Sequence, residues 1–339
     1  MIRTLASAPA KIILFGEHFV VYKQPIILGS INKRMKIECK IEEDKNNTVN
    51  IETNHFGKKT FPLSIIENNN HSIVNDFFYP IIYILRKIFS YYSEPYGITI
   101  KIHSEIPYGV GLGSSAALSV AGVAAISGLN NIVKEKNEIL ELAIETERII
   151  HKNSSGADCV VSTYGGLLYY QRTTNINMRS LNLNNELSFI IINTGLKHST
   201  GELVSIVERF RENNLSEFDH LSNDVSRICE RAVKELEEGN CLNIGKLMNK
   251  NQTILERIGV STTEINNIIN ASLQYGAIGS KLTGAGGGGC VLSLVHHQDK
   301  EYFLSNMKKI GYECFPVMIE NQGLKVNIKS SNFKNIIET

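Results

Sequence analysis

The chain has 339 residues, 42% of them hydrophobic and 20% charged, so it holds ample material for a buried core. Its formal net charge of +1 at pH 7 excludes the strong field that draws proteins to nucleic acid or to an anionic membrane. Six widely spaced cysteines without a CxxC pair disfavour a zinc site or a secreted disulfide framework, and they favour the cytoplasm. No apolar stretch reaches the roughly 20 residues that span a bilayer. We therefore expect a small-molecule partner.

The first half of the chain mixes strand and helix patterns. Alternating apolar and polar residues predict half-buried antiparallel strands at 35–41, 48–52 and 97–103. The polar residues at 44–47 predict a hairpin turn. Apolar residues at helical spacing predict amphipathic helices at 77–92 and 135–152.

The second half opens with a continuous apolar run at 188–192, SFIII, which predicts a buried strand. Helical periodicity then predicts helices at 203–210, 218–236, 244–258, 263–275 and 300–309, and apolar runs predict strands at 290–295 and 313–318. Strands and helices are interspersed without regular βαβα alternation, which favours the α+β class. We place a domain boundary near residue 183, between units 1–183 and 184–339.

The segment 106–121, IPYGVGLGSSAALSVA, follows a predicted strand and precedes residues suited to a helix. Glycines let the backbone approach an anion, and the start of a helix offers unpaired N–H groups. The segment therefore predicts a triphosphate loop, formed by Pro107, Gly109, Val110, Gly111, Leu112, Gly113, Ser114, Ser115, Ala116 and Ala117. It has neither the GKS or GKT ending of a Walker A loop nor the dinucleotide GxGxxG spacing. A glycine-rich helix cap without a ligand is the alternative.

Two further segments carry unusual patterns. Residues 281–290, KLTGAGGGGC, hold five glycines in six positions and lead into a predicted strand, so a ligand phosphate or a neighbouring loop is expected close to their backbone. A flexible linker is the alternative. Residues 7–22, SAPAKIILFGEHFVVY, combine apolar strand residues with a lysine, a glutamate and a histidine. Taken singly, these charged side chains would most often be solvated.

Together with 147–166, ERIIHKNSSGADCVVSTYGG, these segments resemble the GHMP kinase superfamily, and most closely its mevalonate kinases. Their patterns look like APGKxILFGEHxVVYG and ERxIHGxPSGxDxxVSTxGG. The resemblance implies a two-domain α+β fold, with an N-terminal ribosomal-protein-S5-like domain that binds ATP and Mg²⁺ and a C-terminal ferredoxin-like domain. It implies ATP-dependent phosphorylation of the primary hydroxyl of mevalonate to 5-phosphomevalonate, in isoprenoid biosynthesis. It also allows a homodimer.

The resemblance further implies roles for individual residues. Asp158 and Lys11 would be catalytic, and Ser115 and Glu147 would bind Mg²⁺. The alcohol substrate would meet Lys11, Glu17, His18, Asp158, Thr163, Thr200, Gly284 and Ala285, with Glu17 and His18 alternatively orienting the first loop. The chain departs from the patterns at Ala10, Lys23, Lys152, Ser154 and Asn193, and none of these changes removes a reacting group.

Structural interpretations of the same residues, and other functions, stay open. Asp158 alone fits a turn residue after Gly156, and Glu147 alone fits an exposed position on a helix. His151, His296 and His297 lack metal-ligand spacing and are interpreted as structural. At the level of function, the alternatives are a phosphomevalonate or sugar kinase of the same superfamily, a mevalonate diphosphate decarboxylase, and a superfamily member that binds ligand without catalysis.

Overall fold

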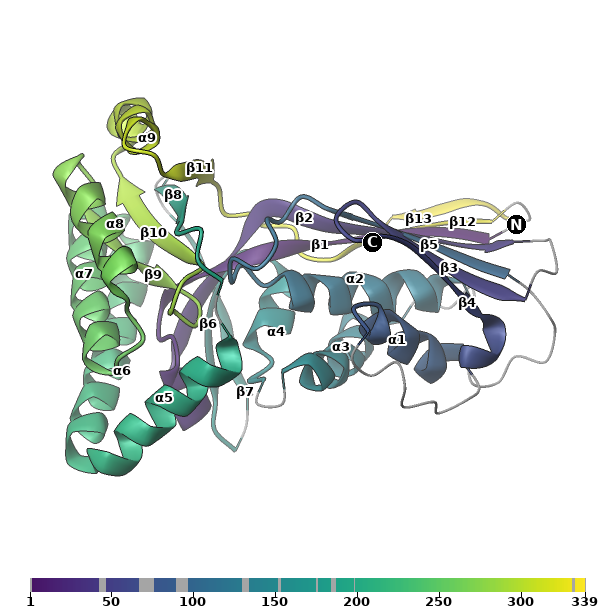
Figure 1. Ribbon diagram of the computed structural model, residues 1–339, viewed down its shortest axis with the longest axis horizontal. Helices are drawn as coiled ribbons and strands as arrows, with labels where there is room; N and C mark the ends of the chain where they lie inside the picture. The colour runs from purple at the N-terminus through teal and green to yellow at the C-terminus, as the bar shows by residue number, and fades with distance from the viewer. Residues whose placement is uncertain are drawn as a thin grey trace.

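The computed structural model describes residues 2–42, 47–66, 76–89, 97–129, 134–151, 154–174, 176–183, 187–197, 199–330 and 333–338. Within these ranges the chain forms two sheets, each covered by helices, which lie side by side along the long axis of the molecule (Figure 1). None of the described helices combines the length and the apolar composition that a bilayer crossing requires.

The larger sheet has nine strands among the described residues, and its main path runs in the order β13-β12-β1-β2-β5-β3-β4. Its strands are β1 (Ile2–Phe15), β2 (Ile26–Glu42), β3 (Thr48–Thr53), β4 (Gly57–Pro62), β5 (Gly97–Ser104), β6 (Leu167–Arg172), β7 (Ile176–Leu181), β12 (Lys325–Ser330) and β13 (Phe333–Glu338). The 17-residue strand β2 pairs along its length with β1, with β6 near its start and with β5 near its end. Strand β2 therefore connects the pair β6 and β7 to the main path of this sheet.

Helices cover one face of the larger sheet (Figure 1). They are α1 (Tyr79–Phe89), α2 (Ser114–Gly128), α3 (Lys136–Ile150) and α4 (Ala157–Tyr164). The sequence of α2 is almost entirely alanine, serine, glycine and valine, and the helix is buried along most of its length. Small side chains let it contact β1, β2 and the other three helices at once. The segment predicted as a triphosphate loop leads directly into this central helix.

The smaller sheet has four antiparallel strands in the part of the chain described, in the order β11-β8-β10-β9. These are β8 (Ser188–Asn193), β9 (Gly279–Thr283), β10 (Cys290–Val295) and β11 (Glu313–Val317). The helices of this unit are α5 (Thr200–Asn213), α6 (Leu215–Glu237), α7 (Cys241–Arg257), α8 (Thr263–Gln274) and α9 (Lys300–Lys309). Short 3₁₀ turns lie at η1 (Phe19–Tyr22), η2 (Leu63–Ile65) and η4 (His297–Asp299).

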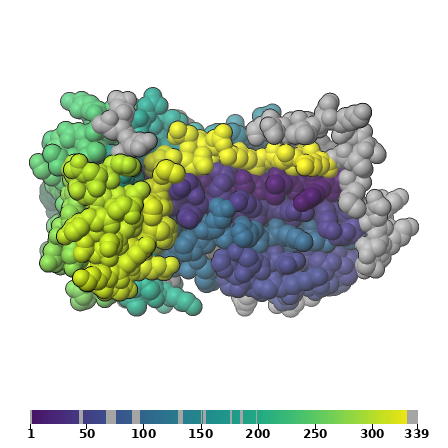
Figure 2. All heavy atoms as spheres, turned by 90° about the horizontal axis from the view of Figure 1, so that it is seen from above, coloured from purple at the N-terminus to yellow at the C-terminus, as the bar shows by residue number. Residues whose placement is uncertain are grey.

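The chain crosses from the smaller sheet back to the larger one after β11. Strand β12 pairs antiparallel with β1, so the last strands of the chain lie beside the first (Figure 2). Arg34 fixes the crossing segment, because its guanidinium donates to the carbonyl oxygens of Gln322 and Gly323 and of Ser7. The domain boundary near residue 183 stays a prediction. The strand pairing places β12 and β13 in the sheet of the first unit.

The α+β class is confirmed, and the predicted helices and strands are present, most with their ends shifted by a few residues. The strand predicted at 35–41 is the second half of β2, which begins at Ile26. One expectation about pairing is wrong, because β3 and β5 are parallel. Alternation shows that one face is buried but does not give strand direction. The predicted turn at 44–47 lies mostly outside the described residues, and it does not close a hairpin, because β5 separates β2 from β3.

Candidate active site

Of the predicted triphosphate loop, residues 107–113 lie between β5 and α2, and residues 114–117 form the first turn of α2. Residues 107–113 are called the phosphate loop below. Gly113 is the residue before α2 and has φ of +76°, in the left-handed region that favours glycine. A Cβ at Gly113 would lie 2.7 Å from Cγ of Lys11, so the absence of a side chain there makes room for the lysine stem. No side chain caps α2, whose first N–H groups lack partners within the helix. This arrangement suits an anion.

Lys11 and Asp158 lie together beside this loop. The Lys11 backbone N–H donates to the Leu112 carbonyl oxygen at 3.0 Å, which ties β1 to the loop. Its Nζ lies 3.2 Å from Oδ2 of Asp158, in the first turn of α4. The Lys11 side chain is 4% exposed and that of Asp158 is 30% exposed. The carboxylate can therefore be reached from solvent while its partner lysine is enclosed.

Glu147, near the end of α3, is buried next to this pair. Its Oε1 lies 3.4 Å from Oγ of Ser115, in the first turn of α2, and its Oε2 accepts from Ser154 Oγ at 3.0 Å and from Cys159 Sγ at 3.1 Å. Burial, with the nearby Asp158 carboxylate, raises the pKa of Glu147 to about 7. A cation at this carboxylate would favour its ionised form.

The site offers only a few protein oxygen atoms to a Mg²⁺ ion. The described residues contain no group of three or more His, Cys, Asp and Glu side chains that could hold a metal by themselves. Mg²⁺ in kinase sites typically keeps several waters and takes only one or two carboxylates, with phosphate oxygens completing the shell. The carboxylate of Glu147 and the hydroxyl of Ser115 are hard oxygen donors that meet next to the uncapped start of α2. The donor set fits Mg²⁺ bound together with a nucleotide.

Glu17 and His18 follow β1 and contact the smaller sheet. Glu17 forms an ion pair with Lys281 of β9, and both side chains are 0% exposed. Burial raises the pKa of Glu17 and lowers that of Lys281, while their mutual attraction opposes both shifts. Asn251 of α7 donates to Glu17 Oε2 at 3.2 Å. The structure thus places Glu17 in a buried network that joins the two sheets.

His18 has φ of +56° and ψ of −41°, an uncommon conformation for a residue with a side chain. Its Nε2 lies 2.7 Å from the Ala285 carbonyl oxygen. Burial lowers the pKa of His18, so the neutral ring is favoured and donates this hydrogen bond. The side-chain hydroxyl of Thr283 accepts from Ile13 N at 2.9 Å and donates to Ile13 O at 3.1 Å. These three hydrogen bonds therefore connect β1 and the turn after it to residues 283–285.

The second glycine run mainly contacts other loops. A Cβ on Gly284 would lie 3.2 Å from the Gly111 carbonyl oxygen, so the two glycine-rich segments meet here. Gly287 N donates to Val260 O and Gly289 N donates to Leu196 O. The sequence predicted that either a ligand phosphate or a neighbouring loop lies close to this backbone. The contacts described here are with neighbouring loops.

Two predicted substrate contacts lie differently. Thr163 is fully buried in α4, and its hydroxyl donates to the Cys159 carbonyl oxygen at 2.8 Å. Thr200 is the first residue of α5, after the N-cap Ser199, and no described contact joins it to the Lys11–Asp158 pair. Their contact with substrate stays a prediction.

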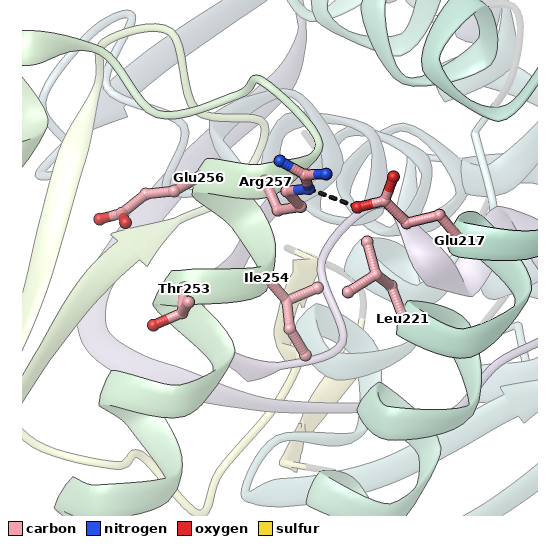
Figure 3. A pocket seen from close by; sticks show the side chains of 6 residues that line it. All are labelled: Glu217, Leu221, Thr253, Ile254, Glu256 and Arg257. Carbon is pink, nitrogen blue, oxygen red and sulfur yellow. Dashed lines mark hydrogen bonds and ion pairs between the residues drawn. The ribbon is translucent and has the colours of Figure 1, made fainter. Parts of the chain in front are cut away.

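Three aromatic rings cluster beside the phosphate loop. Phe56 stacks on Phe77 with ring centroids 3.7 Å apart, and Tyr108 packs edge-on to Phe56 at 4.9 Å. All three are exposed, and Tyr108 is itself part of the loop. An open hollow of about 470 Å³ lies elsewhere, between α6 and α7, where Arg257 pairs with Glu217 (Figure 3). None of the predicted site residues lines that hollow.

Comparison with known proteins gives this arrangement a family. A family profile described as "GHMP kinases N terminal domain" matches residues 77–166, and one described as "GHMP kinases C terminal" matches residues 232–313. The mevalonate kinase of Thermococcus sibiricus is 33% identical over 334 residues, with 96% of this chain and 98% of the relative covered. That of Pyrococcus horikoshii is 34% identical, with 95% and 97% covered. The chain belongs to the GHMP kinase family, in its mevalonate kinase branch.

Solved structures agree with this assignment. The Methanococcus jannaschii mevalonate kinase has a TM-score of 0.81 and 28% identity, with 93% of this chain and 98% of that one covered. The L. major mevalonate kinase in complex with R-mevalonate has a TM-score of 0.79 at 24% identity, with 94% and 96% covered, and this likeness concerns the fold. The two-domain GHMP kinase fold expected from the sequence is confirmed.

Several residues around the site carry no signal in the sequence. Lys281 lies inside the quoted glycine segment, yet nothing in its neighbourhood indicates that it pairs with Glu17, 264 positions earlier. Asn251 is an ordinary polar residue on a predicted helix. Ser154 and Cys159 lie within the 147–166 segment at positions without an assigned role. Knowledge of which strands and helices are neighbours would have been needed to find them.

Proposed function

We propose that the chain transfers the γ-phosphoryl group of ATP to the primary hydroxyl of mevalonate, giving 5-phosphomevalonate and ADP. The observation that carries this proposal is the cluster of Lys11, Asp158, Glu147 and Ser115 at the start of α2. These side chains come from segments up to 147 positions apart along the chain, and a carboxylate–lysine pair lies directly beside an anion-binding loop. That combination supports phosphoryl transfer to an alcohol.

The phosphate loop would bind the triphosphate through its backbone N–H groups and the start of α2. Phosphoryl transfer depends mainly on in-line positioning and on stabilising charge spread over the transferred group. Mg²⁺ would supply charge neutralisation between the β and γ phosphates when it is bound. Ser115 and Glu147 are the residues that would hold it.

Asp158 would accept or direct the proton of the mevalonate hydroxyl. Its partly exposed carboxylate can approach an acceptor, and Lys11 Nζ, 3.2 Å from that carboxylate, would stabilise the developing alkoxide oxygen. His18 and Glu17 would act by holding the loop that follows β1 against Ala285 and Lys281. Their part in substrate binding would then be to shape the acceptor side of the site.

The nucleobase would stack on the aromatic cluster of Phe56, Phe77 and Tyr108. Exposed rings next to a phosphate loop lie where the base of a bound nucleotide can be reached, and stacking on one ring contributes about 1–3 kcal/mol. The Tyr108→Ala variant is then expected to raise the KM for ATP and to leave the KM for mevalonate unchanged. An unchanged KM for ATP would remove Tyr108 from the site.

A coupled assay for ADP release tests the function. Mevalonate, phosphomevalonate, galactose and homoserine are supplied in parallel, each with ATP and Mg²⁺, and turnover is expected with mevalonate. Turnover with another acceptor would move the chain to a different GHMP kinase activity. No ADP release with any of the four would favour a protein that binds ligand without catalysis.

The location and assembly of the enzyme are also proposals. Free cysteines, most of them buried, suit the reducing cytoplasm. A homodimer follows from the family resemblance, and sedimentation of the full chain would test it.

A further inference from the structure

The two oxygens of the Glu147 carboxylate have different surroundings. Oε2 accepts two hydrogen bonds, from Ser154 Oγ at 3.0 Å and from Cys159 Sγ at 3.1 Å. Oε1 has one long contact, at 3.4 Å, with Ser115 Oγ. The glutamate is 3% exposed, so water reaches these oxygens very little. One oxygen is therefore satisfied by the protein, and the other is left to face the phosphate loop.

The two donors hold Glu147 from different elements. Ser154 lies in the turn after α3, where its backbone N–H donates to the His151 carbonyl oxygen at 3.0 Å. Its hydroxyl oxygen accepts from Gly156 N at 3.2 Å, so its single proton is directed to Glu147. Cys159 is fully buried in the first turn of α4, next to Asp158. A carboxylate held from two sides cannot rotate freely about its terminal bond.

We propose that Ser154 and Cys159 are positioning residues that orient the Glu147 carboxylate, so that Oε1 faces Ser115 and the Mg²⁺ of the bound nucleotide. This inference rests on the proposed function. Donors behind a metal-binding carboxylate fix its orientation, and their loss typically lowers metal affinity about 10–100-fold. Ser154 stands where the family pattern has a proline, which carries no hydroxyl. The Ser154 bond is therefore a feature of this chain beyond the pattern it resembles.

Direct metal binding tests the inference without turnover. Mn²⁺ is used as a paramagnetic probe for Mg²⁺, and its Kd is measured by electron paramagnetic resonance on the full chain with a non-hydrolysable ATP analogue. The double variant Ser154→Ala/Cys159→Ala is expected to raise the Kd about tenfold. Cys159→Ser keeps a hydrogen-bond donor at this position. Its Kd for Mn²⁺ is therefore expected to lie closer to the wild-type value than that of Cys159→Ala.

Cys314→Ala is the matched control for the loss of a buried thiol. Its Sγ lies 3.8 Å from the Leu304 carbonyl oxygen, in the smaller sheet and away from Glu147. This variant is expected to lose thermal stability but to bind Mn²⁺ as the wild type does. A double variant at Ser154 and Cys159 that also kept the wild-type Kd, losing only stability, would overturn the positioning role.

Two further results separate this inference from the proposed function. Glu147→Gln is expected to abolish tight Mn²⁺ binding. Wild-type affinity in that variant would show that the carboxylate is not a ligand, and the positioning role would fall with it. If instead the Mn²⁺ Kd values of the variants change as expected but mevalonate is not phosphorylated, mevalonate is not the acceptor. The positioning role of Ser154 and Cys159 is then still supported.

Discussion

Two lysine–carboxylate pairs each have one member near the start of the chain, and they differ in their access to solvent. Lys11 pairs with Asp158, whose side chain is 30% exposed, whereas Lys281 pairs with Glu17 and both side chains are 0% exposed. The same chemistry thus appears once at an open site and once in the core. The open pair can meet a substrate. The enclosed pair joins β9 to the end of β1 and is expected to act through structure.

The largest expected effect is on the enclosed pair. Lys281→Met leaves the Glu17 carboxylate buried without its cation, which typically costs about 3–5 kcal/mol of the free energy of unfolding. Urea denaturation followed by circular dichroism measures this loss. If Lys281→Met is as stable as the wild type yet inactive, the enclosed pair takes part in the reaction, and the contrast between the two pairs is wrong.

The open pair should show the opposite pattern. Asp158→Asn removes the carboxylate that is proposed to direct the hydroxyl proton, and kcat is expected to fall at least about 100-fold. Stability should change little, because the side chain is partly solvated. Steady-state kinetics and the denaturation midpoint are measured on the same preparation. Wild-type turnover in this variant would remove Asp158 from the reaction.

A double variant sharpens the account of the enclosed pair. Glu17→Gln/Lys281→Met leaves no unpaired charge in the core, so it is expected to be about 1–2 kcal/mol more stable than Lys281→Met alone. Denaturation of both single variants and the double variant completes the cycle. If the two losses simply add, the side chains are not coupled and their contact does not stabilise the junction.

The smallest expected effect concerns pH. Burial lowers the pKa of His18, so the unfolded chain binds its proton at a higher pH than the folded chain does. The stability due to the neutral ring is present above the usual histidine pKa of about 6.5 and is lost as the pH falls through the lowered value. His18→Gln is expected to flatten the decline in stability below about pH 6.5. An unchanged slope would show that His18 does not cause it.

The sequence predicts the open pair better than the enclosed one. Lys11, Asp158 and Glu147 each lie in a segment that resembles a family pattern, and the structure brings them together. The Glu17–Lys281 contact depends on how β1 meets β9, which is a property of the tertiary structure and leaves no local periodicity. Ser154 and Cys159, which donate hydrogen bonds to Glu147, are likewise brought there by the packing of α3 against α4.

Local patterns predicted many elements of the fold, but not the strands β4, β6, β7, β12 and β13, and they did not identify which elements are neighbours. Helices such as α9 and strands such as β10 have the predicted bounds, because amphipathic spacing and apolar runs are local signals. The parallel pairing of β3 with β5 and the return of β12 to β1 join segments far apart along the chain. Only side-chain packing across the whole molecule selects these pairings.

The return of β12 to β1 sets an order of events during synthesis. Strand β1 leaves the ribosome long before its partner strand, which begins at Lys325. At about 5–20 residues per second, the β1 edge waits roughly 15–60 s for that partner. An uncovered strand edge can pair with other chains. The growing polypeptide therefore carries an aggregation-prone edge until β12 has been synthesised.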